Sequence, residues 1–305
     1  MELWILLPLF SALIMAAVNV VDKFFVLEGE DNLNFKSFCL YSGGMQLVIC
    51  ITMFLLDPFG FNSETVNSSF LYLILSGIFF GLSLIFLVKA MDLEEISRVE
   101  PIYLIHTIIV PVAGLFILKE SLSYAEYLGI LLIFISSVFA SLRWEGRFSP
   151  INKTAIFSLL LGGILFAIAS VLLKQSVDGN DFSETQVLSI RALGLFISAG
   201  IPMFSLKNVS DLNKFFKHKR RGLTLFIAET LSPLLSMYMI VVALTKLDIS
   251  IVNSFNGARP IFAVILSAFL AAMIKKEFTE KLDFQNLFIK IISGLLAGVG
   301  IIFLA

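Results

Sequence analysis

Ten apolar segments, each about as long as a membrane-spanning helix, follow one another along the sequence. A helix needs about 20 predominantly apolar residues to cross the roughly 30 Å hydrocarbon core of a bilayer. The segments show little of the period-2 alternation of membrane β-strands, so we predict an all-α membrane protein with ten transmembrane helices. The predicted spans are Leu3–Phe25, Phe35–Leu56, Phe70–Met91, Ile96–Leu118, Tyr124–Leu142, Thr154–Leu173, Phe182–Leu206, Gly222–Lys246, Ile249–Ile274 and Leu287–Ala305.

The composition leaves little room for anything besides these spans. Of the 305 residues, 58% are hydrophobic and 15% are charged, whereas about 25% are charged in soluble globular chains. The net charge of −1 excludes a nucleic-acid partner recruited by positive charge. The motifs His-Glu-x-x-His and Gly-x-Gly-x-x-Gly are missing, and the sequence has only two histidines. We therefore expect no enzyme activity, no cofactor and no metal.

The first apolar segment has no basic residue before it and no small-x-small cleavage site after it. A secretory signal peptide has both features. We therefore expect this segment to be a retained span rather than a cleaved signal.

The two halves of the sequence resemble each other. At an offset of 151 residues, Lys23 falls on Lys174, and at an offset of 153 residues, Ser83 falls on Ser236. A repeat with an odd number of spans places its second copy upside down in the membrane, which is a common construction of secondary transporters. We predict two inverted five-helix repeats, residues 1–147 and residues 148–305, within a single transmembrane domain.

Lysine and arginine are distributed unequally between the two ends of the predicted spans. Sixteen lie on the face that holds the first, third, fifth, seventh and ninth joints. Three lie on the opposite face with the termini, namely Lys119, Lys174 and Lys246. Cytoplasmic loops of membrane proteins carry an excess of positive residues. We therefore predict a multi-pass protein of the cell (inner or plasma) membrane, with the basic run Lys214–Arg221 in the cytoplasm and both termini outside.

Short motifs recur in an order that is similar to that of a known family. They are Asn19-Val-Val-Asp22-Lys23, Val88-Lys-Ala90-Met, Ile96-Ser-Arg-Val-Glu-Pro101, Leu118-Lys-Glu120-Ser-Leu-Ser123 with Gly129, and, in the second half, Val242-Ala243, Ile249-Ser250, Pro260 and Lys276-Glu277. With the ten spans and the duplication, they resemble the EamA branch of the drug/metabolite transporter superfamily over essentially the whole chain.

The resemblance implies that the first four helices of each repeat line a central cavity and that the fifth and tenth helices pack as scaffold. It also implies import or export of small metabolites, often amino acids or amphipathic compounds, and often with proton coupling. Many members of the family are drawn with cytoplasmic termini, whereas the charge distribution of this sequence predicts the reverse.

Two ionisable residues deep within predicted spans are candidates for ion coupling. A charged side chain at the bilayer centre costs roughly 2.5 kcal/mol or more. Glu229 lies about 10 Å into the eighth span at 1.5 Å per residue, and Arg191 lies at a similar depth in the seventh. Because these spans enter from opposite faces, the two side chains are within reach of each other. Glu229 is predicted to be a proton or cation site; the alternative is a static ion pair that joins two helices.

Polar residues near the middle of several spans are candidates for substrate binding. A polar stripe on an apolar helix is expected to face water or the bundle interior. The alternatives are hydrogen bonding between helices and, for His106, simple packing. The predicted substrate-binding residues are Asn19, Glu100, Tyr103, His106, Ser170, Asn253, Asn256 and Arg259.

Several glycines are spaced as in close helix–helix contacts, because a missing Cβ lets two backbones approach. They are Gly43-Gly44, Gly162-Gly163 and Gly294-x-x-x-Gly298 with Gly300. We expect these positions to pack against neighbouring helices.

The sequence as a whole predicts a secondary transporter that moves a small polar or amphipathic metabolite, such as an amino acid or an amine, by alternating access. The expected partners are this small-molecule substrate, the lipid bilayer, and protons or another coupling ion, with the chain as a monomer or a homodimer. The alternative is a lipid-linked carrier or flippase component with the same fold. That alternative predicts an apolar lateral opening and lipid-binding basic residues at one face.

Overall fold

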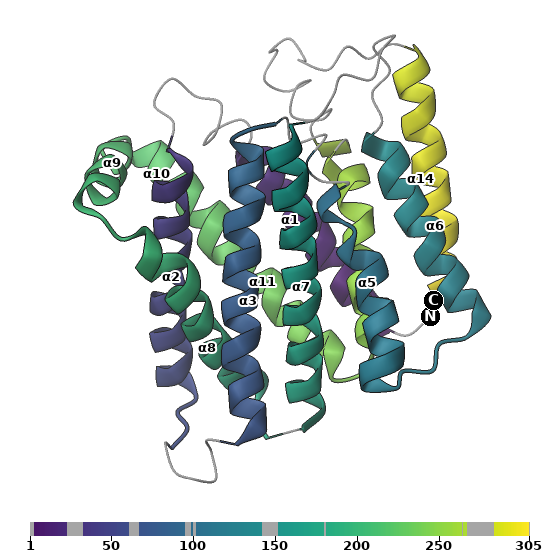
Figure 1. Ribbon diagram of the computed structural model, residues 1–305, viewed down its shortest axis with the longest axis horizontal. Helices are drawn as coiled ribbons and strands as arrows, with labels where there is room; N and C mark the ends of the chain where they lie inside the picture. The colour runs from purple at the N-terminus through teal and green to yellow at the C-terminus, as the bar shows by residue number, and fades with distance from the viewer. Residues whose placement is uncertain are drawn as a thin grey trace.

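In the computed structural model, long helices stand side by side and run roughly along one direction (Figure 1). The structure describes residues 3–22, 33–60, 67–94, 99, 102–141, 152–179, 181–263, 265–266 and 284–304. All regular structure in these ranges is helical. The fold class predicted from the sequence, an all-α membrane protein, is thereby confirmed at this level.

The first half of the chain contains the following helices: η1 (Leu3–Ile5), α1 (Leu6–Asp22), α2 (Phe35–Leu56), α3 (Ser68–Met91), α5 (His106–Ala113), η3 (Gly114–Leu118) and α6 (Tyr124–Ser141). The second half contains α7 (Lys153–Gly179), α8 (Glu184–Leu195), η4 (Phe196–Gly200), η5 (Ile201–Met203), α9 (Leu206–Phe216), α10 (Lys219–Phe226), η6 (Ile227–Leu231), α11 (Ser232–Leu244), α12 (Ile249–Ser254), η7 (Phe255–Ala258) and α14 (Phe284–Leu304).

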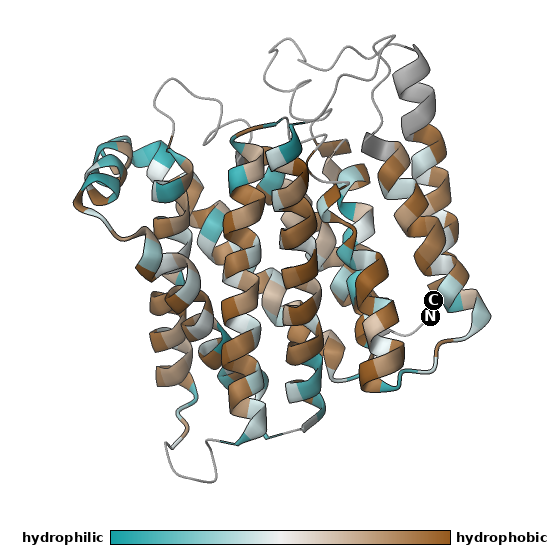
Figure 2. Ribbon diagram, viewed as in Figure 1, coloured by the Kyte–Doolittle hydropathy of each residue, from teal (hydrophilic) through white to brown (hydrophobic). Residues whose placement is uncertain are grey.

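Within the described ranges, five helices are long and apolar enough to cross a membrane. They are Phe35–Leu56, Ser68–Met91, Lys153–Gly179, Glu184–Met203 and Lys219–Leu244, and each coincides with a predicted span to within a few residues. Four shorter apolar helices, Leu6–Val21, His106–Leu118, Tyr124–Phe139 and Ile291–Leu304, match four further predicted spans. Figure 2 shows hydrophobic colour along the long helices and hydrophilic colour on α9 and α10.

Polar caps set the ends of several helices. Asn34 and Asn67 each accept a hydrogen bond from a backbone N–H in the first turn of α2 and α3. Ser183 and Gln186 form a reciprocal capping box at the start of α8. Such side chains supply partners to the first N–H groups of a helix, which have none within it.

The membrane helices of the second half are interrupted by π-helical turns. η4 ends two residues before Pro202, and η6 ends two residues before Pro233. A proline donates no backbone N–H to the preceding turn, so the regular hydrogen-bond ladder is already broken there. The consequence for function is that Glu229 lies on a π-helical turn rather than on a regular helix.

Three hydrogen bonds at seven-residue spacing join α3 to α7, which lie side by side in Figure 1. Ser83 Oγ donates to the carbonyl of Gly162 (2.7 Å), and Ser76 Oγ donates to the carbonyl of Ala169 (2.7 Å). Further along, Ser176 Oγ donates to the carbonyl of Ser69 (3.0 Å). Two antiparallel helices from different halves of the chain are therefore joined along most of their length.

Some of the predicted glycine contacts occur and others do not. A Cβ on Gly43 would meet the backbone of Gly200, and a Cβ on Gly163 would lie 2.9 Å from the carbonyl oxygen of Tyr103. In contrast, a Cβ on Gly44, Gly294 or Gly298 would meet no described atom within 4 Å, so the prediction of a close contact at these three positions is wrong for the described part of the chain. Gly300 makes the contact between α14 and α6 instead, because its carbonyl oxygen lies against Gly129.

Glu120 joins the loop after η3 to the start of α12. The carboxylate accepts hydrogen bonds from the backbone N–H of Ile249 (2.8 Å) and from the hydroxyl of Ser250. These groups belong to the first turn of α12, where backbone N–H groups have no partner within the helix. A carboxylate from the first half of the chain thus holds the beginning of a helix in the second half.

The two termini lie near each other, at the end of the bundle away from α9 and α10 (Figure 1). The helix α9 carries Lys207 and Lys214, and its end is followed by the basic residues Lys217–Arg221. The basic run and the termini are therefore at opposite ends of the bundle, as the alternation of the predicted spans requires.

Candidate functional site

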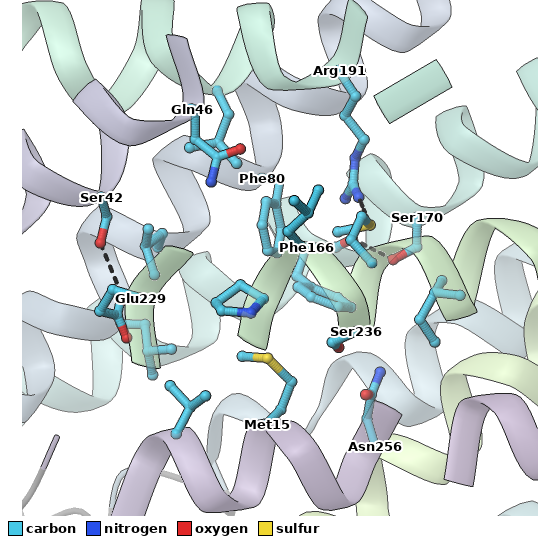
Figure 3. Close-up of a pocket in the computed structure, with 18 of the residues that line it drawn as sticks. Met15, Ser42, Gln46, Phe80, Phe166, Ser170, Arg191, Glu229, Ser236 and Asn256 are labelled. Carbon is cyan, nitrogen blue, oxygen red and sulfur yellow. Dashed lines mark hydrogen bonds between the residues drawn. The ribbon is translucent and has the colours of Figure 1, made fainter. Parts of the chain in front are cut away.

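A cavity of about 190 Å³ lies in the middle of the bundle, between α1, α2, α3, α7, α8, α11, α12 and η7. Most of its wall is apolar, with leucine, methionine and phenylalanine side chains, and a few polar groups project into it (Figure 3). An apolar cavity of about 150 Å³ is large enough to hold benzene. The cavity therefore has room for a small organic molecule.

Eight of the ten residues that the sequence singled out line this cavity. They are Asn19, Tyr103, Ser170, Arg191, Glu229, Asn253, Asn256 and Arg259. They come from both halves of the chain, which the fold brings together around one space. Of the remaining two, Glu100 lies outside the described residues, and His106 does not line the cavity.

Glu229 lies on η6, opposite α2. Its side chain is 8% exposed, and Ser42 Oγ of α2 donates a hydrogen bond of 2.8 Å to its Oε2 atom. Next to this pair, the hydroxyls of Tyr41 and Thr230 are 3.2 Å apart. Glu229 is thus a carboxyl group in the cavity wall, held by a hydroxyl from the neighbouring helix (Figure 3).

Arg191 of α8 is 5% exposed and lies against α3 and α11. Its Nε donates to Ser76 Oγ (3.1 Å), and its guanidinium carbon lies 4.7 Å from the centroid of the Phe80 ring. One terminal nitrogen contacts the sulfur of Met237. The charge is therefore placed over an aromatic face, which attracts cations, and beside a soft sulfur atom.

The expected meeting of Arg191 with Glu229 does not occur. No ion pair joins these two described residues, and Figure 3 shows them on opposite sides of the cavity. The direction in which a side chain points around its helix, and not only its position along the helix, decides whether two groups meet. The static ion pair between Arg191 and Glu229, which was the alternative interpretation, is therefore not formed.

Hydroxyl and amide groups connect other parts of the cavity wall. The Tyr103 hydroxyl lies 2.8 Å from Ser83 Oγ. Asn256 Nδ2 donates to Asn253 Oδ1 (3.0 Å), and Asn253 Nδ2 donates to the carbonyl of His106 (3.3 Å). The interhelical hydrogen bonding that was the alternative for the two asparagines thus occurs through Asn253, whereas Asn256 bonds within its own helix segment and faces the cavity (Figure 3).

His106 is fully buried behind the cavity wall. Its Nδ1 atom lies 2.9 Å from the carbonyl oxygen of Tyr103, and its ring centroid is 4.2 Å from that of Phe166. A turn at Leu104 and Ile105 separates Tyr103 from the start of α5, so the continuous helical spacing assumed for this span does not hold. His106 therefore packs against aromatic rings, as its alternative interpretation predicted.

Sequence reasoning missed several residues of the cavity wall, among them Met15, Ser42, Gln46, Phe80, Phe166, Ser236 and Met237. Gln46 is an uncharged polar residue inside an apolar span, and this signal was available. The two phenylalanines carry no such signal, because the sequence has 31 of them.

No group of three or more histidine, cysteine, aspartate or glutamate residues in the described part of the chain is close enough to hold a metal ion. The cavity presents one carboxyl group, two guanidinium groups and several amides and hydroxyls in an apolar wall.

Long apolar helices around a buried, partly polar cavity define a polytopic helical membrane protein. Residues 2–142 match the sequence model of the EamA-like transporter family. The resemblance seen in the sequence is thereby confirmed over residues 2–142, which are similar to this family of membrane transporters.

Similar folds occur among solved structures, of which 29 chains match. One, described only as "Crystal structure of protein", has a TM-score of 0.68 and 13% sequence identity, and the similarity covers 98% of this chain and 95% of the other. At this identity the similarity shows the fold alone. None of the curated proteins compared matches the sequence.

Proposed function

We propose that the protein is a secondary transporter that moves a small polar or amphipathic metabolite across the cell membrane by alternating access. In this proposal the chain forms ten spans in two inverted repeats, residues 1–147 and 148–305, which rock around the central cavity. Both termini are outside and the basic run Lys214–Arg221 is in the cytoplasm.

The observation that carries the proposal is the convergence of polar groups from both halves on one cavity at mid-bundle. Asn19 comes from the first helix, whereas Ser170, Glu229 and Asn256 come from the second half. Polar groups in a membrane bundle are costly unless they meet partners or water. A cavity that gathers them supports a substrate site rather than a packed core.

Matching contacts in the two halves support the inverted repeat. Ser83 of α3 bonds to the carbonyl of Gly162 in α7, and Ser236 of α11 lies 2.7 Å from Ser11 of α1. Ser83 and Ser236 are equivalent at the offset of 153, and Ser11 and Gly162 are equivalent at the offset of 151. Each half thus places the same serine against the same position of the other half.

We further propose that Glu229 is the coupling group, and that the coupling ion is a proton. Its carboxyl is buried in the cavity wall and accepts a hydrogen bond from the hydroxyl of Ser42. Such an environment makes ionisation sensitive to whether water enters the cavity. A change in the side to which the cavity opens would therefore change the protonation of Glu229.

Binding and exchange together test the proposed transport. Purified protein is first screened with metabolites by thermal shift, because a ligand at 100 times its dissociation constant adds about 2.7 kcal/mol of stability. A hit is then tested for exchange of labelled for unlabelled compound in proteoliposomes. Exchange well above that of protein-free liposomes is expected. Hits that bind without any exchange would contradict transport and would favour the lipid-linked carrier.

A matched pair of variants locates the site. Asn256→Leu removes an amide from the cavity wall, and Asn213→Leu makes the same change at an exposed position of α9. The first variant should bind the hit at least about 10-fold more weakly, which corresponds to 1.4 kcal/mol, and the second should bind as the wild type does. If Asn256→Leu loses folded protein and binding in equal measure, Asn256 is a structural residue and not a substrate-binding one.

A further inference from the structure

Arg191 is a buried cation that faces no described acidic side chain. Lys174 differs in this respect, because its amino group lies 2.7 Å from the carboxylate of Asp178. The contacts of Arg191 are a hydroxyl, a sulfur atom and an aromatic ring, none of which carries a negative charge. An uncompensated charge in a low-dielectric interior is expensive, and an anion in contact with it would offset that cost.

Some N–H donors of the Arg191 guanidinium group make no hydrogen bond to a described group. A guanidinium group has five N–H groups in a fixed plane. Nε bonds to Ser76 and Nη1 contacts Met237, whereas no described group accepts a hydrogen bond from Nη2. The residue lies in the wall of the cavity and points into it (Figure 3). The donors that remain are therefore available to a molecule in the cavity.

The surroundings of Arg191 restrict the kind of anion. A planar guanidinium matches a planar carboxylate through two parallel hydrogen bonds. Phe80, Phe166, Met15 and Met237 give the adjoining wall aromatic and thioether character, which suits an apolar or aromatic body. When the Glu229 carboxyl group on the other side of the cavity is ionised, it repels a second negative charge on the ligand.

We infer that Arg191 is the anion-binding residue of the cavity, and that the ligand is an organic monocarboxylate whose apolar or aromatic body lies against Phe80 and Phe166. This inference deepens the proposed function, because it names the substrate class of the same cavity. It also gives Arg191 a role other than the ion coupling predicted from the sequence.

Three probes with one carbon skeleton test the charge preference of the wild-type protein. They are 3-phenylpropionate, the neutral 3-phenylpropionamide and the cationic 3-phenylpropylamine, each titrated calorimetrically into the full chain in an uncharged detergent at pH 7. The carboxylate should bind at least about 10-fold more tightly than the amide, as expected for a hydrogen-bonded charge pair. A carboxylate that binds no better than the amide overturns the inference without any variant.

Two substitutions then assign the preference to Arg191. Arg191→Gln should abolish the difference between carboxylate and amide, whereas Arg220→Gln, the same change at an exposed position of α10, should leave it unchanged. If Arg191→Gln does not fold, Arg191→Lys is used instead, because it keeps the positive charge but cannot form two parallel hydrogen bonds to a carboxylate. It should prefer the carboxylate less strongly than the wild type does. A full preference in either folded Arg191 variant would place the anion site elsewhere.

The binding test and the transport test can each refute one proposal without refuting the other. Calorimetry on the protein in detergent involves no movement across a membrane. If the carboxylate binds through Arg191 but no bound compound exchanges in proteoliposomes, the anion site stands and the proposed transport falls. If a cationic or neutral compound is exchanged and the carboxylate is not bound, the transport stands and the anion site falls.

Discussion

A close contact between α3 and α8 offers a sharp test of the packing that positions Arg191. At this point Gly77 of α3 lies against Gly194 of α8, one helical turn from Arg191. A Cβ added to Gly77 would lie 2.9 Å from the Cα atom of Gly194 and would also meet the carbonyl oxygen of Arg191. Since the atoms in the way are backbone atoms, no side chain can rotate aside, and α3 and α8 must move apart.

The magnitude for Gly77→Ala follows from two opposing terms. An ordinary contact of the added methyl group needs about 3.4–4 Å, and the carbonyl oxygen of Arg191 is the nearest atom, so the helices must separate by more than about 1 Å. Overpacking of this kind costs about 1–3 kcal/mol, and the upper end applies because only backbone can yield. Replacing glycine by alanine in a helix returns about 1 kcal/mol. The expected net loss is about 2 kcal/mol.

The control is Gly44→Ala on α2, where an added Cβ would meet no described atom within 4 Å. This variant keeps the gain in helix propensity without the clash, so its thermal unfolding midpoint in detergent should equal or exceed that of the wild type. The midpoint of Gly77→Ala should fall. Because Ser76 and Phe80 lie on α3, the displacement should also weaken binding of 3-phenylpropionate. A Gly77→Ala protein as stable as Gly44→Ala would refute the packing that we describe.

Three further predictions concern topology, coupling and the contact at Glu120. In a background without the native cysteines, Ser68→Cys should react with a membrane-impermeant maleimide added to intact cells, whereas Lys217→Cys should react only after lysis. The opposite labelling pattern would show that the predicted orientation is wrong. Glu229→Gln, which mimics the protonated acid, should lose uptake driven by a pH gradient but keep exchange at equal concentrations, and uptake that persists would rule out Glu229 as the coupling site. Burial raises the pKa of the Glu120 carboxyl above its ordinary 4.5, against the lowering effect of the hydrogen bond from Ser250. The stability linked to this proton is therefore present below pH 4.5 and lost as the pH rises through the raised pKa, so the unfolding midpoint of Glu120→Gln should vary less with pH in this window.

The apolar segments predicted the helices well, because hydrophobic length alone decides whether a helix can cross a bilayer. The predicted Phe35–Leu56 coincides with α2, and Tyr124–Leu142 differs from α6 by a single residue. Prediction was weaker where the backbone is irregular. The turn at Leu104 and Ile105, just before His106, cannot be found by counting apolar residues, and it interrupts the continuous helix that was assumed for this span.

The sequence predicted many of the residues that line the cavity but not the contacts between their side chains. Polar residues in apolar spans are conspicuous, and most of those singled out line the cavity. The partners of Arg191 could not be found in this way, because Phe80 and Met237 are ordinary apolar letters in the sequence. Only the rotation of α3 and α11 about their axes brings an aromatic face and a sulfur atom to the guanidinium group.

The serine contacts between α3 and α7 have a consequence for the order of synthesis. The last residue of α7 follows the last residue of α3 by about 90 positions, and a ribosome adds roughly 5–20 residues per second. For some 4–18 s, therefore, α3 exists before its partner is complete. During that interval Ser76 and Ser83 can turn back to carbonyl oxygens of their own helix, four residues earlier. The serine side chain, unlike that of asparagine or glutamine, is short enough to donate a hydrogen bond to its own helix before α7 is made. Once α7 is present, the serine can exchange that hydrogen bond for one to a carbonyl group of α7.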